Sequence, residues 1–452
     1  MNVKIRLKKQ FRLEQIFSNE FKLYIGQFAI KITTDCELIS QEIAKLPFGV
    51  KEEKLIDLIN SKKSPQQESM LLASLHKNCC LEYCFFSSDK TVPSFTISPK
   101  RPYAFLADTP SEESLVESFS AYHFSKFSYF RWLNEEVLLE NPLSRINIFI
   151  SDKSLLSYLF STSKLPESNK CVTILFRELV NENFVLLLKD MEKESIQMWD
   201  FPDLLFHKHS RMQESPYPPN FGASFRFEEP KECLKRESTN GINLQKPDLS
   251  ALLSNDLPLS HVLEIRRTRR RHGATPITKK QLGELLYRVF HFKNEHSEVK
   301  KNEFHVYPNA GNIHEFEIYI LINYCEDLES GIYQYDCQKN ILCRIEANSH
   351  DIMEILALAG SAWSDRSHLP QVLINLSCNF SKVFWKYEGI GYRNSLVNAG
   401  TIVQTIYLVA EAMNLAACCL GYGCSDLFSK VIQCHPLEQT SILEMAIGTR
   451  ED

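Results

Sequence analysis

The chain has 452 residues, of which 44% are hydrophobic and 24% charged, and its formal net charge is −5 at pH 7. This length exceeds one ordinary domain and predicts two or three. The acidic balance argues against a protein that coats nucleic acid, because such binding depends on neutralising phosphates with basic side chains. The 14 cysteines are too sparse for a disulfide framework and lie in apolar runs, which predicts free thiols in a cytoplasmic protein.

The first residues predict a strand rather than an export signal. Residues 3–8 alternate apolar and basic side chains, the period of a half-buried strand, and no continuous apolar stretch follows them. The most apolar stretch, residues 402–420, is interrupted by Gln404, Glu411 and Asn414. We therefore expect a helix buried in protein and no membrane span.

Residues 1–105 and 118–210 each predict a small α+β module. Each places helices beside a β-hairpin, which is the winged-helix arrangement, and their similar order suggests internal duplication. In the first module we expect strands at 27–32 and 81–86 and amphipathic helices at 52–59 and 68–76. In the second we expect strands at 129–132, 137–139, 147–150 and 184–188 and helices at 153–160 and 173–180.

Residues 211–255 predict a linker, because they are rich in proline and charge and show no sustained periodicity. Residues 256–452 predict a second globular region of mixed structure. We expect helices at 259–267, 279–290, 349–359 and 397–417, and strands at 315–324, 331–335, 372–377 and 442–448. The strand at 315–324 is apolar on both faces, which predicts a central strand covered by helices on both sides.

Five arginines lie within residues 266–271, with Thr268 among them. Arginines this dense suit concentrated negative charge, usually phosphate, which they bind through bidentate charge-assisted hydrogen bonds. Composition alone leaves open a solvated helix end or a patch for an acidic partner. No glycine-rich P-loop or dinucleotide fingerprint occurs, so the sequence predicts neither an ATP nor an NAD site.

Two further segments carry candidate site residues. The run Pro308-Asn309-Ala310-Gly311 predicts a tight turn whose small residues let the backbone approach a flat ligand closely. Lys386 and Tyr387 place side by side two groups that can carry a proton. Taken alone, the run is more typical of a structural turn. The Lys-Tyr pair, taken alone, is more typical of a surface pair at a helix N-terminus.

A metal site is not predicted. His76, Cys79, Cys80 and Cys84 lie near one another in sequence, but their spacing is irregular and they are embedded in apolar residues, which favours core thiols.

In their order along the chain these motifs resemble the flavin-dependent nitroreductase superfamily. More narrowly they resemble SagB-type (McbC-like) azoline dehydrogenases, which are similar to cyanobactin thiazoline/oxazoline oxidases. The resemblance implies an α+β fold, in which two small winged-helix-like modules precede a nitroreductase-like FMN domain with an antiparallel or mixed sheet covered by helices. The matching segments are residues 266–270, 308–311, 331–336, 386–387, 391–393, 398–400 and 417–422, with 124–129 and 199–207 upstream.

The resemblance implies an enzyme that oxidises thiazolines or oxazolines of a ribosomally made peptide to thiazoles or oxazoles, with FMN as cofactor and oxygen as electron acceptor. Lys386 and Tyr387 match the catalytic pair, and Lys386 in its neutral form could take the proton, helped by Tyr387. The residues that would hold FMN are Arg266, Arg267, Thr268, Arg270, Pro308, Asn309, Ala310, Gly311, Gly421, Tyr422 and Arg450.

Three residues depart from the pattern of the family. Thr268 replaces a serine but keeps the hydroxyl, and Asn309 replaces a serine in the turn. Glu315 stands where proline is common, which we expect to put a charge near the edge of the flavin ring. These departures concern substrate fit more than cofactor binding.

The superfamily places its flavin between two subunits, which implies a homodimer with the helix at 397–417 in the interface. The front modules would capture the leader of a precursor peptide that carries azoline rings, by adding a strand to a wing; packing or oligomerisation domains are the alternative. An NAD(P)H-dependent nitroreductase or flavin reductase for small molecules, and a peptide-binding scaffold with an inactive oxidase domain, are the rival functions. Neither nucleic acid nor a membrane is expected as a partner.

Overall fold

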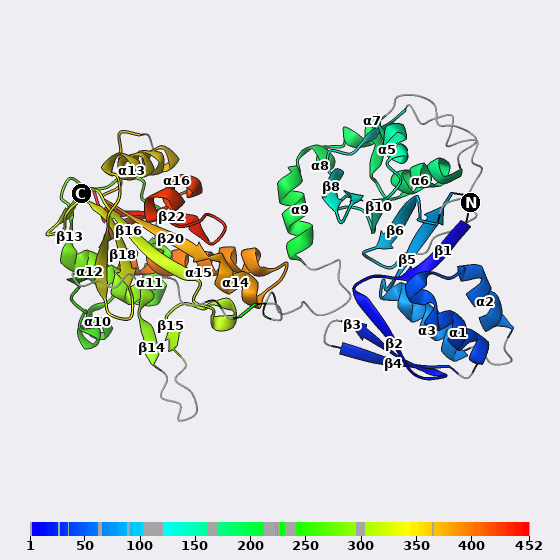
Figure 1. Cartoon of the computed structure of the whole chain (residues 1–452). Helices are drawn as coiled ribbons and strands as arrows, with labels where there is room; N and C mark the ends of the chain where they lie inside the picture. The colour runs from blue at the N-terminus through cyan, green and yellow to red at the C-terminus, as the bar shows by residue number, and fades with distance from the viewer. Residues whose placement is uncertain are drawn as a thin grey trace. The chain divides into compact units, whose positions relative to one another are not determined.

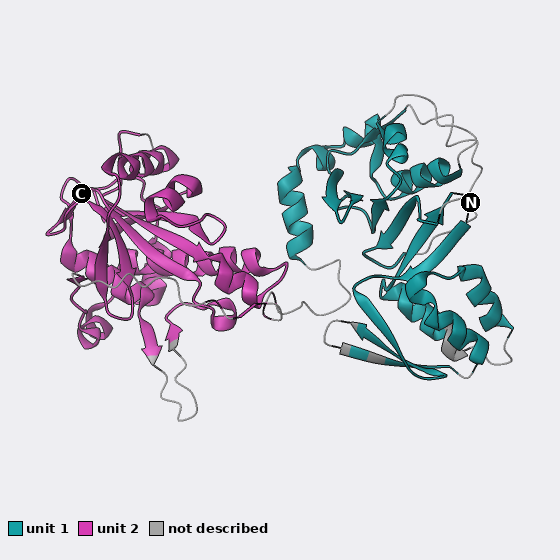
Figure 2. Ribbon diagram, in the orientation of Figure 1, with its two compact units in different colours: residues 1–220 teal, residues 221–452 magenta. Residues whose placement is uncertain are grey.

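The computed structural model describes residues 2–25, 28–34, 36–61, 66–87, 91–103, 121–160, 170–211, 222, 224, 227–228, 230, 241–294, 303–363 and 366–451. The chain divides into two compact units, Met1–Asn220 and Phe221–Asp452 (Figure 2). Their helices and strands are labelled in Figure 1. Among the described helices, none is long and apolar enough to cross a membrane.

The first unit is built on an antiparallel six-stranded sheet with the order β1-β5-β6-β10-β9-β8. Strand β6 of the first expected module pairs with β10 of the second, so the two share one sheet. Their winged-helix character stays a prediction. The strands of this sheet are β1 Asn2–Leu7, β5 Leu81–Phe86, β6 Phe95–Pro99, β8 Tyr129–Leu133, β9 Glu136–Glu140 and β10 Ile146–Ile150.

One hydrophobic core extends through the first unit and includes side chains from both halves, such as Phe85, Ile148 and Phe176. Cys79, Cys80 and Cys84 are buried free thiols, as expected of core cysteines. The other strands are β2 Phe11–Phe17, β3 Glu20–Ile25, β4 Phe28–Thr33, β7 Tyr122–Phe124 and β11 Val185–Leu187. The helices are α1 Glu37–Ala44, η1 Leu46–Phe48, α2 Glu52–Asn60, α3 Gln66–Lys77, α5 Ser154–Leu159, α6 Lys170–Asn181, α7 Leu188–Met191, α8 Glu194–Gln197 and α9 Phe201–Ser210.

The second unit contains a seven-stranded sheet with the order β12-β19-β18-β16-β20-β22-β21, in which neighbouring strands are antiparallel. Its strands are β12 Ile242–Asn243, β16 Phe316–Ile322, β18 Gly331–Asp336, β19 Ile341–Ile345, β20 Val372–Asn379, β21 Leu415–Cys419 and β22 Gln439–Thr449. Two short pairs lie outside it, β13 Ile277–Thr278 with β17 Cys325–Glu326 and β14 Phe292–Asn294 with β15 Glu303–His305.

Helices cover both faces of this sheet, and β16 is its central strand. Ile320 packs into a core with α12 and α15, whereas its neighbour Leu321 packs into a core with α13 and α16. This confirms the predicted central strand. The helices are α10 Leu249–Asn255, α11 Leu259–Ile265, α12 Lys279–Phe290, η3 Ala310–Asn312, α13 Ser349–Trp363, α14 Phe380–Lys386, α15 Gly391–Ala412 and α16 Ser425–Ile432.

Three local predictions differ from the structure. Helix α15 ends at Ala412 instead of 417, because Asn414 adopts a φ of +57° and residues 415–419 pair with β22 as strand β21. Lys386 ends α14, so the Lys-Tyr pair lies at a helix C-terminus and not at an N-terminus. The expected linker at 211–255 includes β12 and α10, whereas its residues 212–221 and 231–240 lie outside the described residues.

His272 packs against Gly448 of strand β22 as a neutral imidazole. Its ring lies 4.6 Å from that of Trp363, and its Nδ1 accepts a hydrogen bond from the Gln371 backbone N–H at 3.1 Å. Burial lowers the pKa of His272 to about 4. A proton on Nδ1 would also break the bond from Gln371.

We predict that His272 makes the folded state sensitive to acid. The unfolded chain binds a proton near pH 6.5, but folded His272 does so only near pH 4, so stability should fall by about 1.4 kcal/mol per pH unit between these values. The variant His272→Asn keeps an acceptor and does not titrate, so its unfolding midpoint should depend less on pH. Calorimetry from pH 7.5 to about 4.5 measures this, with exposed His350→Asn as control; equal slopes in both variants would contradict the prediction.

Candidate functional site

The predicted turn at 308–311 is attached to helix α15. The Pro308 carbonyl accepts a hydrogen bond from Thr401 Oγ1 at 3.0 Å, and the Ala310 N–H donates to Asn398 Oδ1 at 3.0 Å. Asn309 caps the short helix η3 that follows. The turn is therefore held by polar side chains of one helix, and Asn398 and Thr401 are site residues that sequence reasoning did not assign.

The two departures Asn309 and Glu315 form one hydrogen-bonded unit. Glu315 is 1% exposed, and its carboxylate accepts from Asn309 Nδ2 at 2.9 Å and from Asn398 Nδ2 at 2.7 Å. Asn309 Oδ1 also accepts from the Ile313 N–H at 3.1 Å. Both carboxylate oxygens are thus bound by amides within the turn and α15, and the expected charge near the edge of the flavin ring stays a prediction.

Lys386 and Tyr387 meet the turn at Gly311, although Lys386 and Gly311 are 75 residues apart in sequence. Lys386 Nζ donates a hydrogen bond to the Gly311 carbonyl at 2.5 Å. Gly311 has a φ of +69°, and a Cβ at this position would lie 2.4 Å from Tyr387 Oη and 3.2 Å from Lys386 Nζ. Glycine is required here for both conformation and space.

The path of the chain explains this meeting. Strand β20 runs beside β16 and ends where the Asn379 N–H donates to the Glu315 carbonyl at 2.8 Å. The Asn379 side chain then accepts from the Lys382 N–H and caps α14. The short helix carries Lys386 at its last position back to the turn.

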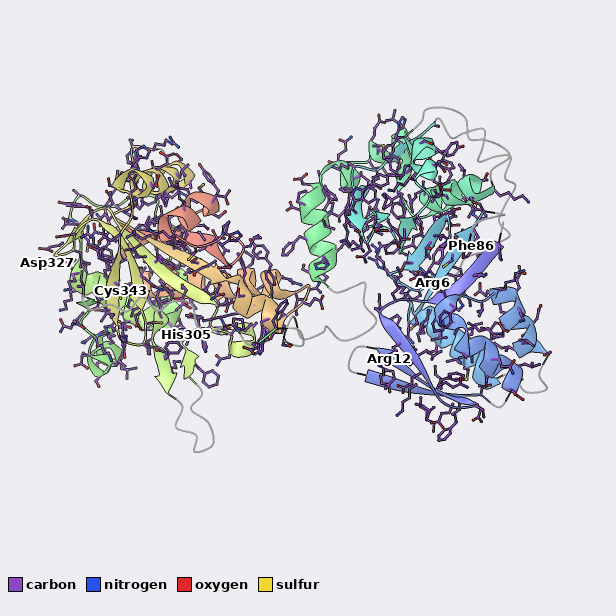
Figure 3. The ribbon with its side chains drawn as sticks, in the orientation of Figure 1. Arg6, Arg12, Phe86, His305, Asp327 and Cys343 are labelled. Atoms are coloured by element: carbon purple, nitrogen blue, oxygen red, sulfur yellow. The ribbon has the colours of Figure 1, made fainter. Side chains whose placement is uncertain are left out.

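Beneath the turn, His305 on β15 (Figure 3) stacks on Tyr307 with ring centroids 4.6 Å apart. Burial and the nearby His314 lower the pKa of His305 to about 3, so its imidazole is neutral. Burial also raises the pKa of Tyr307 well above its usual value. The rings that pack against the turn are therefore uncharged.

The arginine segment contacts α15 near Tyr407. The Arg266 guanidinium lies 5.4 Å from the centroid of the Tyr407 ring, and Thr268 Oγ1 donates to Tyr407 Oη at 3.3 Å. Tyr407 Oη also accepts from the Cys419 N–H at 2.8 Å, which joins the end of β21 to the same point. Tyr407 is a further residue that sequence reasoning missed.

The arginines divide into two groups. Arg269 and Arg450 both pair with buried Glu411 of α15, with Nη2 to Oε1 distances of 3.6 and 2.7 Å. Within the described part of the chain, Arg266, Arg267 and Arg270 have no carboxylate at ion-pair distance. Arg271 likewise has none there, so four arginines of the run stay available to an anion.

Arg450 was expected to contact the cofactor. The structure places its guanidinium on the Glu411 carboxylate and on two backbone carbonyls, that of Glu411 in α15 at 3.4 Å and that of Leu415 at the start of β21 at 3.2 Å. Its described contacts are therefore those of a residue that fixes the end of the helix.

Gly421 and Tyr422 follow β21 in an exposed loop. A Cβ at Gly421 would meet no atom within 4 Å, and Tyr422 is 56% exposed. Among the described residues, no hydrogen bond joins them to the turn or to Lys386. Glu444 supports the loop from below: its carbonyl accepts from the Leu420 N–H at 3.0 Å, and burial raises the pKa of its side chain to about 7.

We predict that Glu315→Gln destabilises the protein by about 1–3 kcal/mol. The substitution replaces one carboxylate oxygen, a hydrogen-bond acceptor, with an NH2 group. This new donor would face the amide donor of Asn309 or Asn398. Thermal unfolding measures the loss. Glu346→Gln, which removes a charge at an exposed site, is the matched control, and equal midpoints for the two variants would contradict a structural role of the carboxylate.

Comparisons with known proteins match two parts of the chain. Residues 263–449 match the nitroreductase family, and residues 122–215 match the family of the cyanobactin oxidase ThcOx. A protein of Methanocaldococcus jannaschii that carries the name nitroreductase is 24% identical over 211 residues, which are 46% of this chain and 97% of the relative.

Solved structures show weaker likeness. A nitroreductase of Ralstonia eutropha is 19% identical with a TM-score of 0.38 and covers 52% of this chain and 99% of its own. The microcin synthetase McbBCD of Escherichia coli, solved with truncated pro-MccB17, is 19% identical with a TM-score of 0.35 and covers 50% of this chain and 81% of its own.

Six of the seven strands of the sheet covered by helices, the turn and the arginine segment lie within the range 263–449, and strand β12 precedes it. The chain therefore contains a nitroreductase family domain of mixed α+β structure, preceded by a segment that matches the cyanobactin oxidase ThcOx family.

Proposed function

We propose that the protein is an FMN-dependent dehydrogenase that converts thiazolines or oxazolines of a ribosomally made peptide into thiazoles or oxazoles. The observation that carries the proposal is the meeting of Lys386, Tyr387 and Gly311 at one point of the nitroreductase domain. A proton-carrying pair held against an exposed turn suits abstraction of a proton from a substrate carbon.

The described residues fit FMN. Thr401, which holds the turn, and Tyr407, which contacts the arginine segment, are about 9 Å apart along α15 at about 1.5 Å per residue. This separation suits a flat ring at the turn and a phosphate at Arg266, Arg267 and Arg270. Bound FMN would supply the hydride acceptor.

Arg450 fits this cofactor role least well. Its side chain pairs with Glu411, so we propose that it supports the arginine segment through this carboxylate and does not bind phosphate. Thr268 would offer its hydroxyl, whereas the open space at Gly421 leaves room beside the ring.

The residues of this chain then perform the proton chemistry. An azoline ring becomes aromatic when it loses a hydride from one carbon and a proton from its neighbour. The Gly311 carbonyl orients Lys386, and Tyr387 Oη lies against the same glycine, so either side chain could take the proton from the ring carbon.

The match of residues 122–215 to the cyanobactin oxidase family supports a peptide substrate. We propose that the first unit binds that peptide and that the enzyme is a homodimer with oxygen as electron acceptor. A nitroreductase that uses NAD(P)H is the second candidate, favoured by the match of residues 263–449.

Arg266→Ala should yield protein that is purified without yellow colour, because one of the three arginines proposed to bind the phosphate is lost. Flavin absorbance per chain is the measurement. Arg271→Ala, in the same exposed run, is the control and should retain flavin. A yellow Arg266→Ala protein with unchanged flavin affinity would refute the assignment.

Lys386→Ala should keep flavin but lower dehydrogenation by about 10²–10⁴-fold, the usual contribution of a general acid or base. The assay follows loss of two hydrogens from a synthetic thiazoline peptide by mass spectrometry, with oxygen and without NAD(P)H. Lys382→Ala, one turn earlier on α14, is the matched control. Full turnover of Lys386→Ala would exclude this role, and turnover that requires NAD(P)H would favour the reductase.

A further inference from the structure

The first unit contains a cavity of about 480 Å³ that is distinct from the nitroreductase domain. It is lined by Tyr129 and Arg131 of β8, by Glu140 at the end of β9, and by one side of α9. Tyr129 and Arg131 are two residues apart on a strand and so share a face of the sheet. Most of these residues lie in the segment that matches the cyanobactin oxidase family.

Its charge is positive. Arg131 is neutralised by Glu140, with Nε to Oε2 at 2.5 Å, but Lys100 and Lys208 also line the cavity. Glu140 is the single carboxylate among the lining residues. In the described part of the chain, Lys208 has no carboxylate at ion-pair distance, so a positive charge faces the cavity.

Its walls are apolar. Pro202, Leu205 and Phe206 follow the i, i+3, i+4 spacing and so lie on one face of α9, opposite Tyr129. A ligand that fits must therefore combine a negative group with an apolar group. A phosphate or a nucleic-acid backbone would use the lysines but not these walls.

The cavity also adjoins a sheet edge, because β8 is the last strand in the order of the six-stranded sheet. An extended peptide can add to such an edge through its backbone and place alternate side chains in pockets beside it. The sheet edge, the apolar wall and the lysines thus favour one kind of partner.

We propose that this cavity binds an extended acidic segment of a peptide, with an Asp or Glu carboxylate between Lys100 and Lys208 and an apolar side chain against Leu205 and Phe206. The identification of this peptide as the substrate rests on the proposed function; the peptide site itself does not. None of the lining residues belongs to the candidate site around Lys386, so the segment would determine binding and not the chemical step.

Binding of a labelled peptide to the full chain tests the proposal. The probe is a fluorescein-labelled peptide that alternates Glu with Leu, compared by anisotropy with the same peptide carrying Gln for Glu. The Glu peptide should bind more tightly, and Lys208→Glu should weaken it by about 10-fold or more, which corresponds to about 1.4 kcal/mol. Lys208→Arg should restore binding, because it keeps the charge.

Lys22→Glu on β3 has the same effect on net charge and is the matched control, for which unchanged affinity is expected. Equal binding of the Gln peptide, an unaffected Lys208→Glu variant, or equal displacement by a single-stranded oligonucleotide of the same charge would each overturn the proposal. The assay needs neither flavin nor turnover, so peptide binding without azoline oxidation would refute the proposed function alone.

Discussion

The arrangement of the candidate site depends on the buried carboxylate of Glu315. A charge with 1% exposure persists only if hydrogen bonds replace its water, and two amides provide them, one from Asn309 in the turn and one from Asn398 in α15. The backbone carbonyl of the same residue receives the Asn379 N–H at the start of α14. One residue thus joins the turn, the long helix and the helix that carries Lys386.

Helix α15 extends this arrangement to the arginine segment. Its Asn398 and Thr401 form hydrogen bonds with the turn. Its Tyr407 accepts hydrogen bonds from the Thr268 hydroxyl and from the Cys419 N–H. Beyond them Glu411 neutralises Arg269 and Arg450. The positive charges of a dense arginine cluster repel one another. Pairing Arg269 with the buried carboxylate lowers this repulsion, and the unpaired arginines stay available to an anion.

The first unit differs from the second in its architecture and in its proposed role. Its six-stranded sheet spans both expected modules, and one core includes side chains of both, so its two halves are structurally joined. If the proposals hold, this unit selects a peptide and the nitroreductase domain oxidises it. Binding energy from residues that take no part in the chemistry would then position a substrate whose azoline rings vary in their neighbours.

The sequence by itself determined the elements and the chemistry of single residues. Period and apolarity predicted the central strand β16 and helix α12, and a dense arginine run indicated an anion site. Local pattern could not separate α15 from β21, because both are apolar and the break depends on Asn414 and on pairing with β22.

Tertiary structure alone decided which arginines are free and why Asn309 and Glu315 occur together. Arg269 and Arg270 are neighbours in sequence, yet only Arg269 reaches Glu411, 142 positions further along the chain by their residue numbers. Likewise the Lys386 side chain is oriented by a hydrogen bond to the carbonyl of Gly311, 75 residues earlier. Such pairings arise from strand order and helix ends that bring distant segments together, and no local spacing encodes them.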